Sequence, residues 1–283
     1  MRALLTRLER FRSVDRVGDP ARAAVEAVLP SDGVRDALHG RWLGHPLHPA
    51  VVQFPLGAWL SATVLDLLPG TRREATTLLI AGTAAALPAA VTGGADFTTL
   101  SREQRRVAVL HALANSAALG LMVSSIVARL RGRHTTGRWL SLAGVGVAGG
   151  SAMLGGHLSF SQDAGANHSA AALPLVPDGW HDLGATGEYR PGAIEARMLG
   201  ETPVLVHRED DRFSVLIGRC AHRSGPLVDG TPVEIDGDAC LQCPWHGSVF
   251  RLRDGRAMRG PASSDQTVLR TRVRNDRLEA ARP

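Results

Sequence analysis

The chain has 283 residues, which is more than one small domain needs and enough for two domains. It contains no lysine: all 32 basic residues are arginine, the formal net charge is +5, and aromatic residues make up only 4%. Because nucleic-acid-binding surfaces combine basic residues with exposed aromatic ones, this composition argues against nucleic acid as a partner and favours a membrane surface.

The first 44 residues are expected to form an amphipathic N-terminal segment (1–44). This segment carries eight of the arginines, which suit the headgroup region of a membrane. Asp19-Pro20 predicts the start of one helix, and Ser31-Asp32-Gly33 predicts a break before a second short helix over Val34–His39.

Residues 45–160 contain four long apolar stretches, which are Val51–Leu68, Ala75–Ala95, Val107–Ala128 and Trp139–Leu158. Each is about as long as a helix that crosses a hydrocarbon core of about 30 Å. A soluble helical bundle is the alternative, but its helices would need polar outer faces, and these stretches are apolar all round. The sequence therefore predicts four transmembrane helices.

Ionisable residues near the ends of these stretches form a predicted polar cluster, whose members are His45, His48, Asp96, His111 and His157. Alternating helix direction is expected to bring them to the leaflet that carries both termini. Such residues are costly in a membrane and usually functional. Three interpretations stay open. The histidines could ligate a b-type haem, bind a quinone headgroup, or contact lipid phosphate, backbone and one another.

The stretch from Trp42 to Pro55, which includes His45-Pro46-Leu47-His48-Pro49, resembles a family of uncharacterised four-helix bacterial membrane domains. The resemblance covers about residues 35–168 and implies a fold but no chemistry. Arginines are more frequent on the side of the two termini than in the opposite loops. We therefore expect a multi-pass protein of the bacterial cell membrane, with the N-terminus and the C-terminal domain in the cytoplasm.

Residues 161–177 are rich in Ala, Ser and Pro and predict a linker. As a flexible chain, this linker would span about 20–25 Å. It would then keep the following domain within reach of the membrane surface.

Residues 178–283 predict short strands and turns. Pro203–Val206 and Phe213–Ile217 predict a hairpin with Glu209-Asp210-Asp211 as its turn, and Val268–Val273 and Leu278–Ala280 predict the last strands. The expected fold class is therefore a membrane α-helical bundle of four transmembrane helices, followed by an all-β antiparallel barrel or sandwich.

Two short motifs in this β domain carry the most specific chemistry of the chain. They are Cys220-Ala-His222 and Cys243-Pro-Trp-His246. Two thiolates and two imidazoles suit a [2Fe–2S] cluster of mixed ligation, in which two Cys hold one iron and two His hold the other. Zinc is the competing ligand, because Cys240 and Cys243 also form a Cys-x-x-Cys pair.

These motifs resemble the Rieske family, and the likeness extends to Gly225-Pro226-Leu227, Pro244-Trp245, Gly247 and Gly260-Pro261-Ala262. The resemblance implies that Cys220 and Cys243 bind an inner iron and that His222 and His246 bind an exposed outer iron. It also implies that Ser248 and Pro261 surround the cluster. Respiratory members carry a disulfide where this chain has Gly225 and Trp245, and a tyrosine where it has Phe250. We therefore expect a reduction potential in the middle of the Rieske range.

The sequence predicts a membrane-anchored protein that transfers single electrons to a redox partner protein or a quinone, with membrane lipid around its helices. The membrane part is expected to exchange electrons with quinone or haem. The alternative is a redox sensor, or a structural cluster- or zinc-binding membrane protein. We expect no mononuclear-iron oxygenase site, because that site needs a separate soluble domain with two His and one carboxylate.

Overall fold

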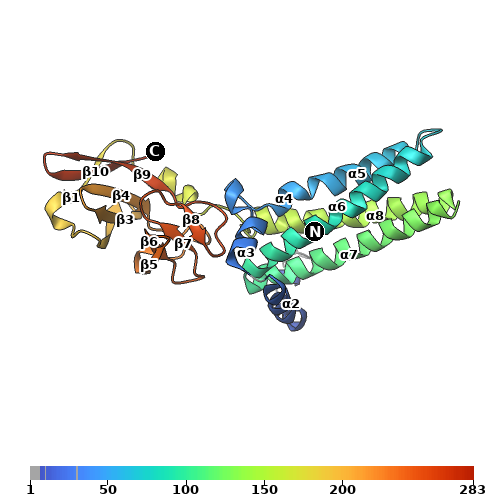
Figure 1. Ribbon diagram of the computed structural model, residues 1–283, viewed down its shortest axis with the longest axis horizontal. Helices are drawn as coiled ribbons and strands as arrows, with labels where there is room; N and C mark the ends of the chain where they lie inside the picture. The colour runs from blue at the N-terminus through green and yellow to red at the C-terminus, as the bar shows by residue number, and fades with distance from the viewer. Residues whose placement is uncertain (1–6, 10, 30) are drawn as a thin grey trace. The chain divides into compact units, whose positions relative to one another are not determined.

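The computed structural model describes residues 7–9, 11–29 and 31–283, and the chain divides into two compact units (Figure 1). The first unit comprises the chain up to His39 together with Pro46–Ala164. The second comprises Gly40–His45 together with Gly165–Pro283.

The first unit is helical. Its helices are α2 (Asp15–Val28), α3 (Asp32–Leu38), α4 (His48–Val51), α5 (Gln53–Leu65), α6 (Arg72–Thr99), α7 (Arg102–Leu130) and α8 (His134–Phe160). Helices α5 to α8 lie side by side as a bundle (Figure 1). Helices α6, α7 and α8 are each long and apolar enough to cross a membrane. Leucines such as Leu60, Leu87 and Leu113 point outward, as a lipid-facing surface requires.

The first predicted span, Val51–Leu68, is not one long helix. It is divided at Val52 into α4 and the 13-residue α5. Pro55 has no N–H to donate to the carbonyl group of Val51, which favours a break there. At 1.5 Å per residue, α5 is about 20 Å long, short of the roughly 30 Å of a hydrocarbon core. The structure thus contains three of the four predicted long helices, and the count of four is not confirmed.

The carboxyl end of α5 is held by a buried ion pair between Asp66 and Arg129 of α7. The Arg129 side chain is 1% exposed, and its Nη1 lies 2.8 Å from Asp66 Oδ1. Ser125 and Ser141 satisfy the other nitrogen atoms of the guanidinium group. This pair links α5 to α7 and α8.

We expect Asp66→Ala to destabilise the helical unit by about 3–5 kcal/mol, because it leaves a buried guanidinium group without its counter-charge. The matched control is Glu26→Ala. Glu26 pairs with Arg22 at 2.7 Å, and the two side chains are 39% and 43% exposed. We expect about 1 kcal/mol or less from that exposed pair. The loss of helicity during a detergent denaturation series measures both values, and equal losses would contradict the prediction.

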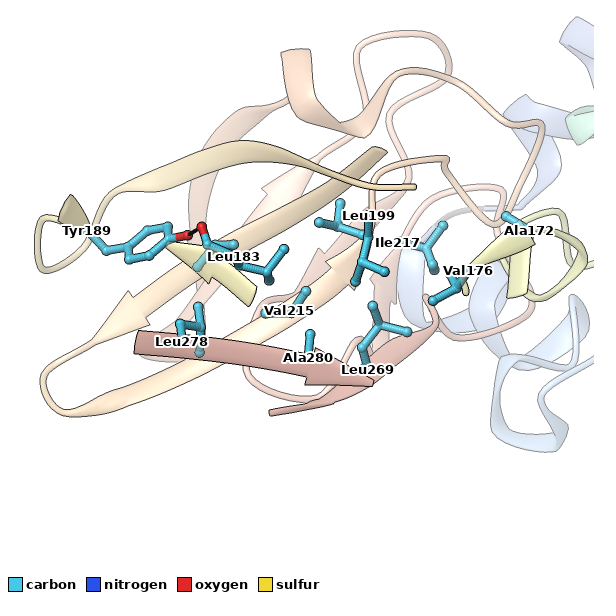
Figure 2. Packing of buried hydrophobic residues seen from close by; sticks show 12 residues of the cluster. Ala172, Val176, Leu183, Tyr189, Leu199, Val215, Ile217, Leu269, Leu278 and Ala280 are labelled. Carbon is cyan, nitrogen blue, oxygen red and sulfur yellow. Dashed lines mark hydrogen bonds between the residues drawn. The ribbon is translucent and has the colours of Figure 1, made fainter. Parts of the chain in front are cut away.

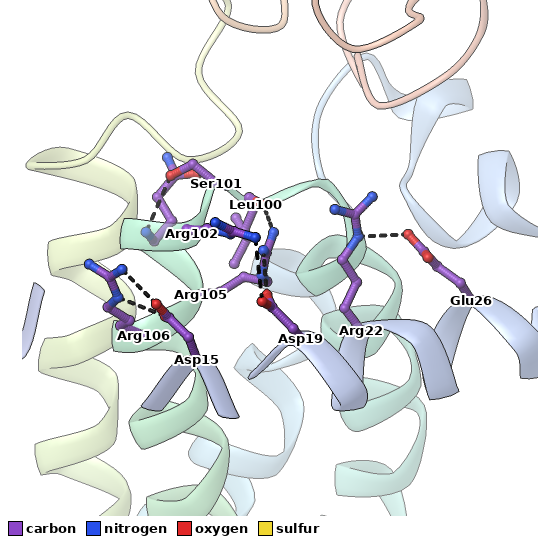
Figure 3. A network of polar contacts seen from close by, with 10 residues as sticks. Asp15, Asp19, Arg22, Glu26, Leu100, Ser101, Arg102, Arg105 and Arg106 are labelled. Carbon is purple, nitrogen blue, oxygen red and sulfur yellow. Dashed lines mark hydrogen bonds and ion pairs between the residues drawn. The ribbon is translucent and has the colours of Figure 1, made fainter. Parts of the chain in front are cut away.

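Helix α2 lies against the start of α7 through a set of ion pairs (Figure 3). Asp15 accepts two hydrogen bonds of 2.7 Å from Arg106, and Asp19 accepts one from Arg105. The helix begins at Asp15 and not at the predicted Asp19-Pro20, since the acidic side chain of Asp15 stabilises the first turn. Arg105 and Arg106 are among the arginines on the side of the two termini that predict the orientation, and their pairing with carboxylates offsets part of that positive charge.

The second unit is an all-β antiparallel domain, as the sequence predicts. A six-stranded sheet has the order β1-β10-β9-β4-β3-β2, and a four-stranded sheet has the order β5-β6-β7-β8. The strands are β1 (His181–Ala185), β2 (Ile194–Leu199), β3 (Thr202–Glu209), β4 (Arg212–Ile217), β5 (Thr231–Ile235), β6 (Asp238–Gln242), β7 (Val249–Arg251), β8 (Ala257–Arg259), β9 (Val268–Arg274) and β10 (Arg277–Ala281). The predicted hairpin is β3–β4, and its turn contains Asp210 at a positive φ of 54°.

One apolar core of this domain packs on the larger sheet (Figure 2). Tyr189 is buried there, and its hydroxyl group donates a hydrogen bond to the carbonyl oxygen of Leu183. A second core lies under the loops that carry the Cys and His motifs, and it includes Phe250, Leu227 and Leu241.

The predicted flexible linker differs from the structure. From Gly165 onward it belongs to the β unit and contains a short 3₁₀ helix, Ala170–Leu175. Ala172 and Val176 join the apolar core, and Ser169 Oγ lies 2.9 Å from Thr267 Oγ1. These contacts hold the segment against the domain. Burying the Ala172 and Val176 side chains stabilises the folded domain, whereas the same side chains in a solvated tether would add no such stability.

Candidate functional site

Two loops of the β domain carry the motif residues and share one backbone geometry. The first loop, residues 219–226, lies between β4 and β5. In it, the N–H of Cys220 donates to the carbonyl oxygen of Gly225 (2.9 Å), and the N–H of Ser224 donates to that of Cys220 (2.8 Å). Ser224 has a positive φ of 54°.

The second loop, residues 243–248, lies between β6 and β7 and repeats this pattern. The N–H of Cys243 donates to the carbonyl oxygen of Ser248 (2.8 Å), and the N–H of Gly247 donates to that of Cys243 (3.1 Å). Gly247 has a φ of 75°, at the same place in the loop as Ser224. Each loop thus holds its cysteine in an equivalent position.

The two cysteine thiols lie together at the edge of an apolar core. Cys220 is 1% exposed and Cys243 is 2% exposed, and both pack with Phe250. A hydrogen bond from Cys220 lowers the pKa of Cys243 to about 6. The same bond, together with burial, raises the pKa of Cys220. Because the Cys220 and Cys243 thiols lie this close together, both sulfur atoms can bind the same metal centre.

The two histidines of the motifs lie together as well, on the more exposed side. The imidazole centroids of His222 and His246 are 5.0 Å apart, with the rings nearly perpendicular. His246 is exposed and His222 is half-buried. Trp245 is 58% exposed and lies edge-on to His246, with ring centroids 6.2 Å apart.

The candidate metal ligands therefore form two pairs. The two cysteine sulfur atoms are buried, and the two histidine imidazoles lie on the more exposed side. Among the residues that the structure describes, no group of three or more His, Cys, Asp or Glu side chains is arranged to hold a single metal ion. Tetrahedral zinc needs such a group, whereas a binuclear cluster of mixed ligation needs two separate pairs. The third cysteine, Cys240, is buried in a different apolar cluster, with Ile235 and Val249. The geometry fits the [2Fe–2S] group.

Two glycines allow the loops to approach one another. A Cβ on Gly225 would lie 3.1 Å from Cys243 Sγ and from the Trp245 ring. The two loops are therefore in direct contact at the place where respiratory Rieske proteins have a disulfide. A Cβ on Gly260, where φ is 89°, would lie 2.6 Å from the carbonyl oxygen of Gly247. Only glycine lets the third loop, residues 259–263, cross the second loop so closely.

Ser248 and Pro261 lie where the second and third loops meet. Ser248 is fully buried, and its Oγ accepts a hydrogen bond from the N–H of Ala262 (3.2 Å). Because Ser248 accepts this bond, its own hydroxyl proton is still available for donation. Phe250 is fully buried nearby and has no hydroxyl group to donate.

Gln266 supports the first loop and was not anticipated from the sequence. Its Oε1 accepts a hydrogen bond from the N–H of Ala221 (2.8 Å), between the two motif residues of that loop. Its Nε2 donates to the carbonyl oxygens of Ile217 (2.6 Å) and Arg219 (2.8 Å). An amide in a loop-rich stretch gives no local signal of this role, since its three partners lie more than 40 residues away in the chain.

We expect Gln266→Leu to destabilise the first loop by about 2–3 kcal/mol, because it leaves buried backbone groups without partners. The visible absorbance of the cluster, followed at raised temperature in the intact chain, should then decay many times faster than in the unmodified protein. Ser264→Ala is the matched control in the same segment, because the Ser264 hydroxyl group donates to the carbonyl oxygen of Gly44, which lies outside the first loop. Equal decay of the two variants would contradict the role of Gln266.

The predicted polar cluster of the helical unit separates into three pairs. They are His39 with Asp96 (3.1 Å), Glu9 with His157 (2.7 Å), and His48 with His111 (ring centroids 6.3 Å). The alternation of helix direction thus brings only His48 and His111 together. His39 and Glu9 were not predicted as partners of these residues, because both come from the N-terminal segment. His45 groups with the β unit.

Comparison with known proteins identifies relatives of the β domain. The anthranilate 1,2-dioxygenase ferredoxin subunit of Burkholderia cepacia is 30% identical over 100 residues, which are 35% of this chain and 89% of that protein. Ferredoxin CarAc of Metapseudomonas resinovorans is 34% identical over 90 residues, which are 31% of this chain and 77% of that protein. The solved ferredoxin of carbazole 1,9a-dioxygenase from Nocardioides aromaticivorans IC177 is 20% identical, with a TM-score of 0.34, and the match covers 37% of this chain and 98% of that one.

The β domain is therefore similar in sequence to ferredoxins. A family model described as Rieske [2Fe-2S] domain matches residues 179–272. The chain belongs to the Rieske family. A second model, described as predicted membrane protein (DUF2231), matches residues 44–168, so the chain joins a Rieske domain to a membrane domain.

Proposed function

We propose that Cys220 and Cys243 hold the inner iron of a [2Fe–2S] cluster and that His222 and His246 hold the outer iron. The equivalent backbone of the two loops, the buried thiol pair and the adjacent imidazole pair support this assignment. The arrangement of the donors as two pairs favours the cluster over zinc.

The proposed function is one-electron transfer by a membrane-anchored Rieske protein. The bound cluster supplies a centre that takes up and releases one electron. The observation that carries the proposal is the position of the exposed His246 outside a buried cysteine pair, which gives a partner protein access to one side of the site. The related ferredoxin subunits, one of which has been solved in a complex with its oxygenase, support a redox partner protein.

A potentiometric titration of the purified chain tests this proposal. We expect a single one-electron transition. The reduced chain should then pass one electron to a soluble one-electron acceptor protein. A chain that titrates but exchanges no electron with any acceptor would favour the redox-sensor alternative. Zinc in place of iron would favour a structural site.

The hydroxyl group of Ser248 provides a test of the cluster environment. We expect Ser248→Ala to lower the reduction potential by a small part of the range from about −150 to +300 mV, because a hydrogen bond toward the cluster stabilises its reduced form. Ser264→Ala should leave the potential unchanged. An unchanged potential in Ser248→Ala would place that hydroxyl group elsewhere.

We further propose that the helical unit spans a bacterial cell membrane several times, with lipid around it and with the N-terminus and the Rieske domain in the cytoplasm. The three long apolar helices and the family match support a membrane location. In this unit, we propose that electrons are exchanged with a haem or a quinone. The polar residues His48, Asp96, His111 and His157 are the candidates for that site, whereas His45 groups with the β unit.

A further inference from the structure

A short segment that precedes α4 in the chain belongs to the β unit. This segment, Gly40–His45, is called the N-terminal strap below, and it groups with the Rieske domain. Its centre is a single turn of 3₁₀ helix, Arg41–Leu43. Gly40 and Gly44 flank this turn with positive φ angles of 75° and 78°, which favour glycine. Residues 40–43 lie outside both segments that the family models match.

The guanidinium group of Arg41 bridges two backbone carbonyl groups at the start of the third loop. Its Nη1 donates to the carbonyl oxygen of Met258, and its Nη2 donates to that of Gly260 at 3.1 Å. These partners are 217 and 219 residues away in the chain. Because the donor is charged and its nitrogen atoms are held in one plane, the two bonds fix both the position and the direction of the loop.

The strap also contacts the residue that follows the third loop. Ser264 Oγ donates a hydrogen bond of 2.8 Å to the carbonyl oxygen of Gly44. This bond is neutral and exposed to solvent, so it is weaker than the charged bonds of Arg41. The strap therefore contacts both ends of the third loop, and Arg41 supplies the stronger contact.

The third loop in turn holds the second loop. A Cβ on Gly260 would lie 2.6 Å from the carbonyl oxygen of Gly247 and 2.8 Å from the Cα of Ser248. Two residues later, the N–H of Ala262 donates to Ser248 Oγ (3.2 Å), and both of these residues are buried. The position of the Ser248 hydroxyl group thus depends on the third loop, which Arg41 holds.

We propose that Arg41 is a positioning residue for the iron–sulfur cluster. It holds the third loop against the second loop and so fixes the Ser248 hydroxyl group beside the cluster. The effect of Arg41 passes through Gly260 and Ala262 to Ser248. The inference rests on the proposed cluster and adds to it a residue from outside the Rieske segment. The strap thus makes the N-terminal part of the chain a component of the electron-transfer domain.

Amide hydrogen exchange in the full chain, purified in mild detergent, tests the contact itself. We expect Arg41→Gln to speed the exchange of residues 258–264 by about tenfold or more, because a glutamine side chain is too short to bridge both carbonyl groups. Strands β3 and β4 should exchange as before, which shows that the domain remains folded. Arg35→Gln is the matched control, because Arg35 also donates to two carbonyl oxygens, those of Glu26 and Leu29 in the helical unit. Unchanged exchange of residues 258–264 in Arg41→Gln would contradict the inference.

The reduction potential of the cluster tests whether the contact reaches Ser248. We expect Arg41→Gln to lower the potential about as much as Ser248→Ala does, and to add little to it in the double variant, since both act through the same contacts. Arg41→Lys keeps the positive charge but donates from one nitrogen atom only, so its potential should stay low. A shift that adds fully to that of Ser248→Ala, or full restoration by lysine, would show that Arg41 acts through its charge alone and would overturn the positioning role.

The two measurements separate this inference from the proposed function. A purified chain without a cluster contradicts the proposed function, whereas the exchange of residues 258–264 needs no cluster and still tests Arg41. A chain that holds the cluster, but in which Arg41→Gln matches Arg35→Gln in exchange and in potential, would refute the role of Arg41 alone.

Discussion

Replacing Cys243 by serine should remove the cluster, and replacing Cys240 by serine should not. Cys243 lies beside Cys220 at the edge of the core under the two loops, whereas Cys240 packs with Ile235 and Val249 on the smaller sheet. A serine hydroxyl binds iron far more weakly than a thiolate, so the inner iron would lose half of its protein ligands. Burial raises the pKa of Cys240, which keeps it a neutral thiol.

Iron and sulfide analysis of the purified chains measures this difference. We expect about two iron atoms per chain in the unmodified protein and in Cys240→Ser, and near zero in Cys243→Ser. Circular dichroism in the near ultraviolet controls for the fold of the β domain. Loss of metal in Cys240→Ser would instead favour a site built on the Cys240–Cys243 pair.

Replacing His222 by cysteine should retain a cluster but lower its reduction potential. A thiolate adds negative charge to the outer iron, which stabilises the oxidised state. The mixed ligation of Rieske centres gives potentials of about −150 to +300 mV, against about −400 mV for plant-type ferredoxins with four Cys ligands. A fall on the order of 100 mV or more is therefore expected from one substitution.

Redox titration followed by magnetic resonance checks this result. His181→Cys is the matched control, because His181 lies on β1 and bonds to the carbonyl oxygen of Asp178. Its potential should equal that of the unmodified protein. An unchanged potential in His222→Cys would show that His222 is not a ligand.

The candidate cluster residues could be predicted because each motif is local. Cys220 and His222 lie on one loop, as do Cys243 and His246, so a few residues of sequence already place two donors together. Gln266 could not be predicted in the same way. Its role depends on the packing of a distant loop against the first loop, which no short-range pattern encodes.

The helical unit was predicted in outline but not in its contacts. Apolar length predicts α6, α7 and α8, since lipid requires long apolar helices. It does not reveal the break at Val52 or the ion pair of Asp66, which depend on a proline and on a partner in α7. Likewise, the alternating direction of the helices predicts that the histidines lie at the same end of the bundle. Only the packing of the helices shows that the His48 ring lies beside the His111 ring.

Pulsed magnetic resonance on the dithionite-reduced chain tests the central claim most directly. We expect a binuclear iron centre coupled to two histidine nitrogens, one from His222 and one from His246, with both couplings changed when histidine is labelled with ¹⁵N. A centre with no nitrogen coupling, or a chain that contains zinc and no iron, would contradict the mixed cysteine and histidine ligation.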